Sequence, residues 1–542
     1  MSDLTLNGEL AAGVSPRPHL DEKPHALGAV VFLLVIAAGL GYAAFSISND
    51  IDLAGEHTVA VGAFVMLAIA LLIALGFEFV NGFHETANAV ATVIYTHSLS
   101  PLVAVIWSGS FNFLGVLTSS GAVAYSVVTL LPVELILQVG SGAGYAMIFA
   151  LLIAAIIWNL GTWAMGLPNS SSHALIGSIM GVGIANQLLA PAGAATSGVD
   201  WGQAGGVLRA LLFSPVIGFV LSLLLLLGMK VVVRSKSLYS APEGKKPPPA
   251  VIRDLLVLTC TGVSFFHGSN DGQKGMGLIM LILIGAAPTA YALNRAMPES
   301  TTPAFLQAVQ AAQNVFQTHA GTTAPPADTA AARATVGHAL QTKTVNNPAV
   351  YAALATLTGD IGQQVKNYGA IKQVPAAATS NVRNDMYLAS DAVRVMGGKP
   401  DGFDTSETAK LKSLAGALNS GTRFIPTWVK VSVALALGLG TMVGWKRIVV
   451  TVGEKIGKTH LTYAQGASAE IVAMATIGLA DGFGLPVSTT HVLSSGVAGT
   501  MLANGSGLQL ATLKNMALAW ILTLPAAMLI AGSLYVILRQ VF

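Results

Sequence analysis

Charged residues are scarce in this sequence. Of its 542 residues only 10% are Asp, Glu, Lys or Arg, whereas a soluble globular protein carries about 25%. So long a chain with so few charges cannot present an ordinary water-facing surface. The composition therefore excludes a typical soluble domain and predicts that most of the surface faces lipid. The formal net charge of +3 is too small to indicate a nucleic-acid partner.

Cysteine is almost absent, and so are the marks of a cleaved leader or an enzyme. The one cysteine, Cys260, stands in an apolar run, so the chain has no internal disulfide. About 25 polar residues precede the first apolar run, which predicts a retained anchor helix rather than a signal peptide. No Ser/His/Asp arrangement, metal-ligand spacing or nucleotide-type glycine loop appears, so we expect neither an enzyme nor a resident cofactor.

Long apolar runs are what the sequence has instead. Hydrophobic residues make up 53% of the chain, and a membrane-spanning helix needs about 20 consecutive apolar residues. Glycine is abundant, as is typical of transmembrane helices that pack closely or break. The sequence thus predicts an all-α polytopic membrane protein. The clearest runs are Ala26–Ala44, Val59–Phe79, Met147–Trp163, Leu211–Val233, Trp428–Val443 and Met516–Leu538.

Two short motifs each occur twice. The acidic motif Asn81–Asn88 matches His267–Lys274, and the tip motif Gly166–His173 matches Gly484–His491 more closely. The two motifs lie farther apart in the second half, and the polar segment 290–424 accounts for the difference. Without that segment the motifs are about equally far apart in both halves, which indicates two related halves rather than chance matches.

These repeats define the expected organisation of the chain. The predicted parts are an N-terminal tail and anchor helix (1–58), a first transmembrane repeat (59–233), a basic cytoplasmic linker (234–253), a second transmembrane repeat (254–289 and 425–542) and an extramembrane, periplasmic helical insert (290–424).

Lys and Arg gather in only some of the loops. They cluster in 234–253 and 444–460 and are missing from 47–58, 132–143 and 191–205. Because basic loops stay cytoplasmic, we predict a cytoplasmic N-terminus, a periplasmic C-terminus and halves of opposite orientation. Each half is expected to contain a helical re-entrant hairpin, giving about 10–12 membrane segments and a substrate site near the midplane.

The acidic motifs place Glu85 and Asp271 inside apolar segments. A carboxylate at the bilayer centre costs about 2.5–3.5 kcal/mol on insertion scales. One interpretation is a neutral or paired carboxyl that serves packing. Equivalent positions in two halves favour a cation or proton site, including a transported metal ion. The neighbouring Gly and Asn residues predict locally unwound helices whose carbonyls help hold the cation. They are Gly82, Asn88, Gly268 and Asn270.

The tip motifs predict an anion site. Pro168 and Pro486 break a helix and favour the start of another, and hydroxyl residues follow at its N-terminus. Helix N-termini present free N–H groups and a positive dipole end, which suit a tetrahedral oxyanion. Ordinary capping of a kinked helix is the alternative for either tip alone. The six candidate ligands are Ser170, Ser171, Ser172, Ser488, Thr489 and Thr490.

Other polar residues are open to two interpretations. His173 and His491 either fix the tips or assist the movement of the anion or proton. His84 and Lys274 are the positions at which the acidic motifs differ, and Lys274 either replaces a bound cation or pairs with Asp271. Glu470 is a candidate for a third cation-linked carboxylate. Trp158, Asn159 and Asn112 are assigned to packing and interhelical hydrogen bonds.

At these motifs the sequence resembles the inorganic phosphate transporter (PiT) family. The similarity covers about 60–290 and 425–540, and it is closest to the bacterial low-affinity Pit permeases. It implies an inner-membrane symporter of inorganic phosphate, coupled to a cation.

Sodium-coupled members of that family carry Asn-Asp in both acidic motifs. His84-Glu85 and Lys274 depart from that pattern, which favours proton coupling and uptake of phosphate as a neutral divalent metal complex. A sodium-coupled phosphate symporter, a sulfate permease of the same fold and, more distantly, an anion channel are the alternatives, and a homodimer with contacts through the insert is left open.

Overall fold

The computed structural model describes residues 18, 20, 26–55, 61–137, 139–191, 198–242, 247–397 and 402–542, without the side chains of 61, 63 and 86–88. Within these residues all regular structure is helical, apart from one isolated bridge between Gly457 and Leu508. A helix satisfies every backbone hydrogen bond within its own segment, which is what a lipid environment requires.

The helices of the first half follow the apolar runs of the sequence. They are α1 (Ala26–Leu53), α2 (Val61–Tyr95), α3 (Pro101–Thr118), α4 (Ala122–Val128), α5 (Val133–Leu137), α6 (Gly142–Ala164), α7 (Ser171–Leu188) and α8 (Trp201–Val232). The 3₁₀ turn η1 (Lys236–Leu238) lies in the basic linker.

The second half is interrupted by the insert. Its helices are α9 (Ala250–Ala286), α10 (Pro288–Tyr291), α16 (Thr427–Gly440), α17 (Lys446–Glu454), α18 (Tyr463–Gly482), α19 (Thr489–Asn504) and α20 (Leu510–Leu538). The insert holds α11 (Thr302–Ala320), α12 (Thr329–Thr342), α13 (Pro348–Tyr368), α14 (Ala376–Gly397) and α15 (Thr405–Thr422), with 3₁₀ turns η2 (Glu299–Thr301) and η3 (Ile371–Gln373).

Seven helices in the described part of the chain are long and apolar enough to cross a membrane: α1, α2, α3, α6, α8, α9 and α20. The count rises to eight if α15 and α16, which meet at a bend of 75°, are taken as one span. The sequence predicts more segments because it also counts α7, α16, α18 and α19. These helices are shorter or richer in Ser and Gly, and are largely buried among their neighbours.

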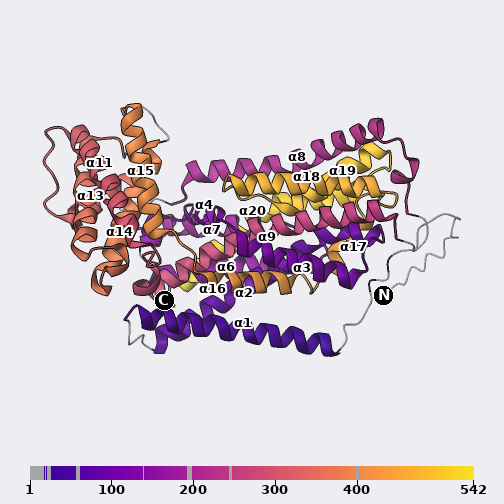
Figure 1. The fold of residues 1–542 in the computed structure, drawn as a ribbon, viewed down its shortest axis with the longest axis horizontal. Helices are drawn as coiled ribbons and strands as arrows, with labels where there is room; N and C mark the ends of the chain where they lie inside the picture. The colour runs from indigo at the N-terminus through magenta and orange to yellow at the C-terminus, as the bar shows by residue number, and fades with distance from the viewer. Residues whose placement is uncertain are drawn as a thin grey trace.

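The long helices run side by side, and the insert stands at one end of them (Figure 1). The insert has an apolar core of its own, built from residues between Leu293 and Leu418 with Val133 added from the first half. The start of α1 lies at the end of the bundle away from the insert, whereas the C-terminal Phe542 lies at the insert end (Figure 1).

Helices of each half pack against helices of the other half. The helix after the first tip, α7, packs along α20, and the helix after the second tip, α19, packs along α8. In the same way α2 packs along α16, and its counterpart α9 packs along α3. Each helix with a functional motif is therefore held largely by the opposite half of the chain.

The glycines of the acidic motifs serve these close crossings. A Cβ at Gly82 would collide with the Leu437 carbonyl on α16, and a Cβ at Gly268 would collide with the Asn112 carbonyl on α3. Both α2 and α9 continue as helix through Glu85 and Asp271. The expectation of locally unwound helices is therefore wrong, because the glycines permit close packing instead of breaking the helix.

The turns before α7 and α19 have the same construction. Gly166 and Gly484 adopt left-handed backbone angles, with φ of 67° and 65°. In each turn the next residue donates back across the helix end, Leu167 N to Thr162 O at 3.0 Å and Leu485 N to Ala480 O at 2.9 Å. This geometry ends α6 and α18, and the following Pro then directs the chain into the next helix.

Candidate substrate and cation site

Glu85 lies at the meeting point of the two tips. Its side chain, on α2, is buried. Its Oε1 accepts a hydrogen bond of 2.9 Å from the backbone N–H of Ser171, at the start of α7. Its Oε2 accepts a hydrogen bond from the hydroxyl of Thr489, at the start of α19. One carboxylate thus binds donors from both helix N-termini, a position that suits a negative charge.

Lys274 joins the second acidic motif to the first tip. Its Nζ lies 2.5 Å from Asp271 Oδ1 and 2.5 Å from Ser172 Oγ, and all three side chains are buried. Ser172 Oγ in turn donates to the carbonyl of Val487 in the second tip, at 3.0 Å. Of the two interpretations of Lys274, the structure supports the pairing with Asp271, which shares its helical face.

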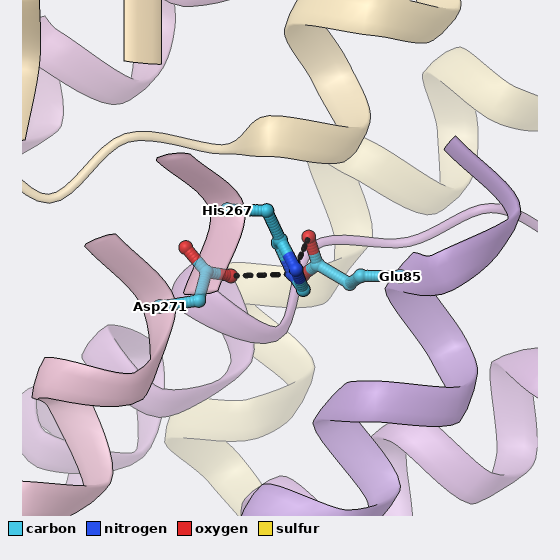
Figure 2. A group of neighbouring side chains, drawn as sticks. All are labelled: Glu85, His267 and Asp271. Carbon is cyan, nitrogen blue, oxygen red and sulfur yellow. Dashed lines mark ion pairs between the residues drawn. The ribbon is translucent and has the colours of Figure 1, made fainter. Parts of the chain in front are cut away.

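Glu85, His267 and Asp271 form a compact cluster (Figure 2). His267 Nε2 lies 3.8 Å from Glu85 Oε2 and 3.6 Å from Asp271 Oδ2. One ligand atom from each of the three residues lies within 4.8 Å of the others, and all three residues are buried. The other ring nitrogen, Nδ1, lies 2.8 Å from Asn112 Oδ1, which fixes the orientation of the ring.

This cluster is suited to a divalent cation. Two carboxylates and an imidazole are ligands that Zn²⁺ and similar metal ions take in proteins. Asp271 Oδ2 and His267 Nε2 have no hydrogen-bond partner within the described residues, so both atoms are available as ligands.

The remaining residues of the acidic motifs differ in their placement. Asn270 donates from Nδ2 to the Leu485 carbonyl at 3.1 Å and so contacts the second tip. His84 turns away from Glu85, and its Nε2 lies 3.2 Å from Thr162 Oγ1 on α6. The structure therefore does not bring His84 into the cluster. The side chain of Asn88 lies outside the described residues.

Ser170 and Ser488 are helix caps. Each side chain accepts the backbone N–H three residues on, from His173 at 3.2 Å and from His491 at 3.1 Å. Capping uses these hydroxyls locally, whereas the hydroxyls of Ser172 and Thr489 contact the buried Lys274 and Glu85. Ser171 Oγ has no hydrogen-bond partner in the described structure. Thr490 is fully buried at the start of α19.

The tip histidines pack against each other at a tilt and do not belong to the cluster. The rings of His173 and His491 have centroids 4.5 Å apart, and His491 stacks on Trp520 at 4.2 Å. Trp520 also donates from Nε1 to the carbonyl of Pro168, which is buried like Pro486. These contacts tie both tips to α20.

Three further carboxylates, the buried Glu78 and Glu470 and the half-buried Asp481, lie outside the Glu85–His267–Asp271 cluster. Glu78 lies two turns before Glu85 on α2, and a Cβ at Gly275 would touch its carboxylate. Asp481 accepts hydrogen bonds from Ser269 and Gln273, both at 2.7 Å. Glu470 accepts from Thr259 on α9, apart from the Glu85 cluster.

Sequence reasoning missed His267, Glu78 and Asp481. Helical spacing offered a signal for two of them, because His267 is four residues before Asp271 and Glu78 is seven before Glu85, so each pair shares a helical face. Asp481 offered no such signal, because its partners are on another helix. The interhelical hydrogen bond predicted for Asn112 is confirmed: it joins α3 to His267 on α9 and so orients the cluster.

Apolar helices of membrane length around buried charged groups and two helix N-termini define the class of integral membrane transport proteins. The model of the phosphate transporter family matches residues 81–531. The chain belongs to this family, which confirms the resemblance inferred from its motifs. Its relatives are transporters and not enzymes.

The similar proteins are bacterial phosphate transporters. The low-affinity inorganic phosphate transporter PitA of Escherichia coli (strain K12) is 42% identical over 493 residues, which cover 87% of this chain and 96% of PitA. PitB of the same organism is 39% identical, covering 88% and 97% of the two chains. A probable low-affinity inorganic phosphate transporter of Bacillus subtilis (strain 168) is 28% identical, covering 88% and 99%.

A solved structure described as the sodium-dependent phosphate transporter is also similar. It shares 19% sequence identity, and the match covers 88% of this chain and 100% of that one with a TM-score of 0.48.

Proposed function

We propose that this protein is a secondary active symporter that takes up inorganic phosphate with protons across the inner membrane. The family supplies the substrate class, and the relatives named low-affinity phosphate transporters agree with it. Phosphate would bind between the two tips, through Ser171, Ser172 and Thr489 and the free N–H groups of α7 and α19.

The observation that carries the proposal is the position of the Glu85 carboxylate. It accepts from the Ser171 N–H and the Thr489 hydroxyl, two of the donors that a phosphate would use. A carboxylate and a phosphate therefore compete for the same donors. Protonation of Glu85 removes its negative charge and weakens its hold on these groups, so a proton and a phosphate bind together.

The surroundings of Glu85 fit this role. His267 and Lys274 are the basic groups that face it, and Asp271 is the acidic one. Lys274 already neutralises Asp271 through a contact of 2.5 Å. Because Lys274 supplies the positive charge beside Asp271, no sodium ion is needed there to balance the carboxylate, which favours protons over sodium as the coupling ion.

A metal–phosphate complex is the second candidate substrate, and the Glu85–His267–Asp271 cluster favours it. A divalent cation there would draw the Glu85 carboxylate toward itself and release the tip donors for phosphate. Such a complex is electrically neutral when the phosphate is HPO₄²⁻. Neutral cargo crosses the low-dielectric interior at lower cost than a bare dianion.

We also propose two inverted repeats with re-entrant tips, an N-terminus in the cytoplasm and the insert in the periplasm. The reciprocal packing of α2 with α16 and α9 with α3, and of α7 with α20 and α19 with α8, supports this symmetry. The matching left-handed glycines before both tips support it further. Alternating access would come from the movement of one half against the other.

Uptake of labelled phosphate by proteoliposomes tests the proposal when proton and sodium gradients are imposed separately. We expect an inward proton gradient alone to drive accumulation, and addition of Mg²⁺ or Zn²⁺ to increase it. Accumulation driven by sodium alone would contradict proton coupling. Transport that never exceeds equilibrium would indicate a channel, and equal inhibition by sulfate and unlabelled phosphate would indicate a general oxyanion permease.

A further inference from the structure

Two arginines line a small cavity between the insert and the membrane bundle. Arg383 is on α14, and Arg423 lies in the connection between α15 and α16. The cavity has a volume of about 30 Å³. It adjoins a larger one of about 270 Å³, because Thr129 and Tyr387 line both. Their lining residues come from both the insert and the membrane bundle.

Neither arginine has an acidic partner. No Asp or Glu of the described chain lies within ion-pair distance of Arg383 or Arg423. Arg383 is 6% exposed and donates from Nη1 to the Ile136 carbonyl at 3.2 Å and to Asn384 Oδ1 at 3.0 Å. The guanidinium of Arg423 rests over the Tyr125 ring, 5.5 Å from its centroid. Arg383 is buried and Arg423 is half-buried, and a positive charge in such a position without a direct ion pair favours a bound anion.

Arg383 keeps its charge in this environment. Burial lowers the pKa of its guanidinium to about 10, so the group is protonated at neutral pH. Its remaining N–H groups, on Nε and Nη2, have no partner in the described residues. The Tyr387 hydroxyl likewise has no hydrogen-bond partner among them, and the Arg383 guanidinium lies 5.3 Å from the centroid of that ring. Arg383, Tyr387 and Arg423 all line the small cavity.

The larger cavity carries no such excess of charge. There Arg394 contacts Asp391 at 2.7 Å and Asp200 at 3.1 Å, and Lys343 lies 3.9 Å from Asp200. Its two acidic and two basic groups offset one another. The positive excess of the joined cavities therefore lies on the inner side, at Arg383 and Arg423.

One wall of the small cavity lies close to the central site. Gly277 on α9 lines it, and Lys274 precedes Gly277 by three residues, about 4.5 Å along the helix axis. The helix α4 also reaches from the small cavity to the region of Lys274. Tyr125 of α4 lines the cavity, and the backbone N–H of Val123 donates to Gln273 at 2.9 Å, next to Lys274.

We propose that Arg383, Arg423 and Tyr387 form a second oxyanion site, which receives phosphate from the insert side before it reaches the tips. The ligand is a tetrahedral oxyanion of the phosphate class. Guanidinium groups bind such anions through paired N–H donors, and the ligand sits where the two cavities join. The order of the two sites depends on the orientation proposed above, whereas binding at the second site does not.

Phosphate binding to the purified full-length protein tests the site without any gradient. We expect labelled phosphate to bind at two sites per chain, and Arg423→Gln to leave one. Arg209→Gln, which changes an exposed arginine on α8 bonded only to the Gly205 carbonyl, should leave two. Equal stoichiometry in the two variants would overturn the proposal. If Arg423→Gln binds no phosphate at all, the variant Tyr387→Phe is tested in its place. Loss of affinity at one of its two sites would support the proposal, and unchanged affinity at both sites would overturn it.

Uptake kinetics provide the second measurement. In Arg423→Gln we expect the KM for phosphate to rise about tenfold, as the loss of one charge-assisted contact predicts, with kcat unchanged. Arg423→Lys keeps the charge, so its KM should lie between those of the wild type and Arg423→Gln. An unchanged KM would overturn the capture role. If the coupling ion proposed above is wrong, the binding stoichiometry stays the same, so the two proposals can fail independently.

Discussion

At the scale of single residues, a charged group of each half is hydrogen-bonded to a hydroxyl of the other half. Glu85 of the first half binds the Thr489 hydroxyl of the second, and Lys274 of the second half binds Ser172 of the first. Most of these groups were predictable because polar residues inside apolar runs are costly and few. Their partners were not, since a contact between positions this far apart in sequence leaves no local pattern.

Variants of the Asp271–Lys274 pair can distinguish a structural role of this pair from a role in transport. Removing one partner leaves a buried unpaired charge, so Asp271→Asn or Lys274→Met alone should each destabilise the fold by about 3–5 kcal/mol. The double variant Asp271→Asn with Lys274→Met removes both charges and should regain most of that stability. We still expect it to transport no phosphate above background.

The two measurements are the apparent melting temperature of the purified protein and phosphate uptake by proteoliposomes. A double variant that regains both stability and uptake would show that the pair serves packing alone. Arg209→Gln is the control, because it changes an exposed charge distant from the pair.

At the scale of the helices, the turns of the two tips could be predicted from the sequence, whereas the close contacts between crossing helices could not. A Gly-Leu-Pro sequence followed by hydroxyl residues encodes a helix end, a break and a new cap, and the structure contains each of them. Gly82 and Gly268 misled the prediction because glycine suits both a broken helix and a close crossing. The break between α3 and α4 was also unforeseen, although Gly121 adopts a φ of 86° there.

Glycine substitutions test the close crossings. Gly268→Ala places a methyl group against the Asn112 backbone, and we expect a destabilisation of about 1–3 kcal/mol from overpacking. At Gly228 on α8 a Cβ meets no atom within 4 Å, so Gly228→Ala should be neutral or slightly stabilising. Apparent melting temperatures of the two variants compare them directly. Equal values would show that α3 and α9 can separate without cost.

At the scale of the whole molecule, the insert marks one end of the bundle. Its helices pack around their own core and meet the bundle near α4, α5 and α10. Sequence reasoning anticipated a helical segment there from the missing apolar runs. The joined cavities at its base were not predictable, because their lining comes from α4, α9, α14 and the end of α15 together.

Labelling of single cysteines tests the proposed orientation. Ser240 in the basic linker and Ala409 on α15 are both exposed, whereas the native Cys260 is buried. In a Cys260→Ala background, we expect a membrane-impermeant maleimide to label Ala409→Cys from the periplasmic side and Ser240→Cys only after the inner membrane is opened. The reverse pattern would invert the whole topology.

In the proposed mechanism the Glu85 carboxylate competes with phosphate for the donors of the two tips. Equilibrium binding of labelled phosphate as a function of pH, compared between the wild type and Glu85→Gln, tests it most directly. The glutamine has nearly the same shape but no charge. The pH dependence of binding by the variant therefore shows the effect of the titration of phosphate itself. We expect Glu85→Gln to bind phosphate more tightly at alkaline pH and to lose the extra gain in affinity that the wild type shows on acidification. Equal pH dependence in the two proteins, or weaker binding by the variant, would contradict the account.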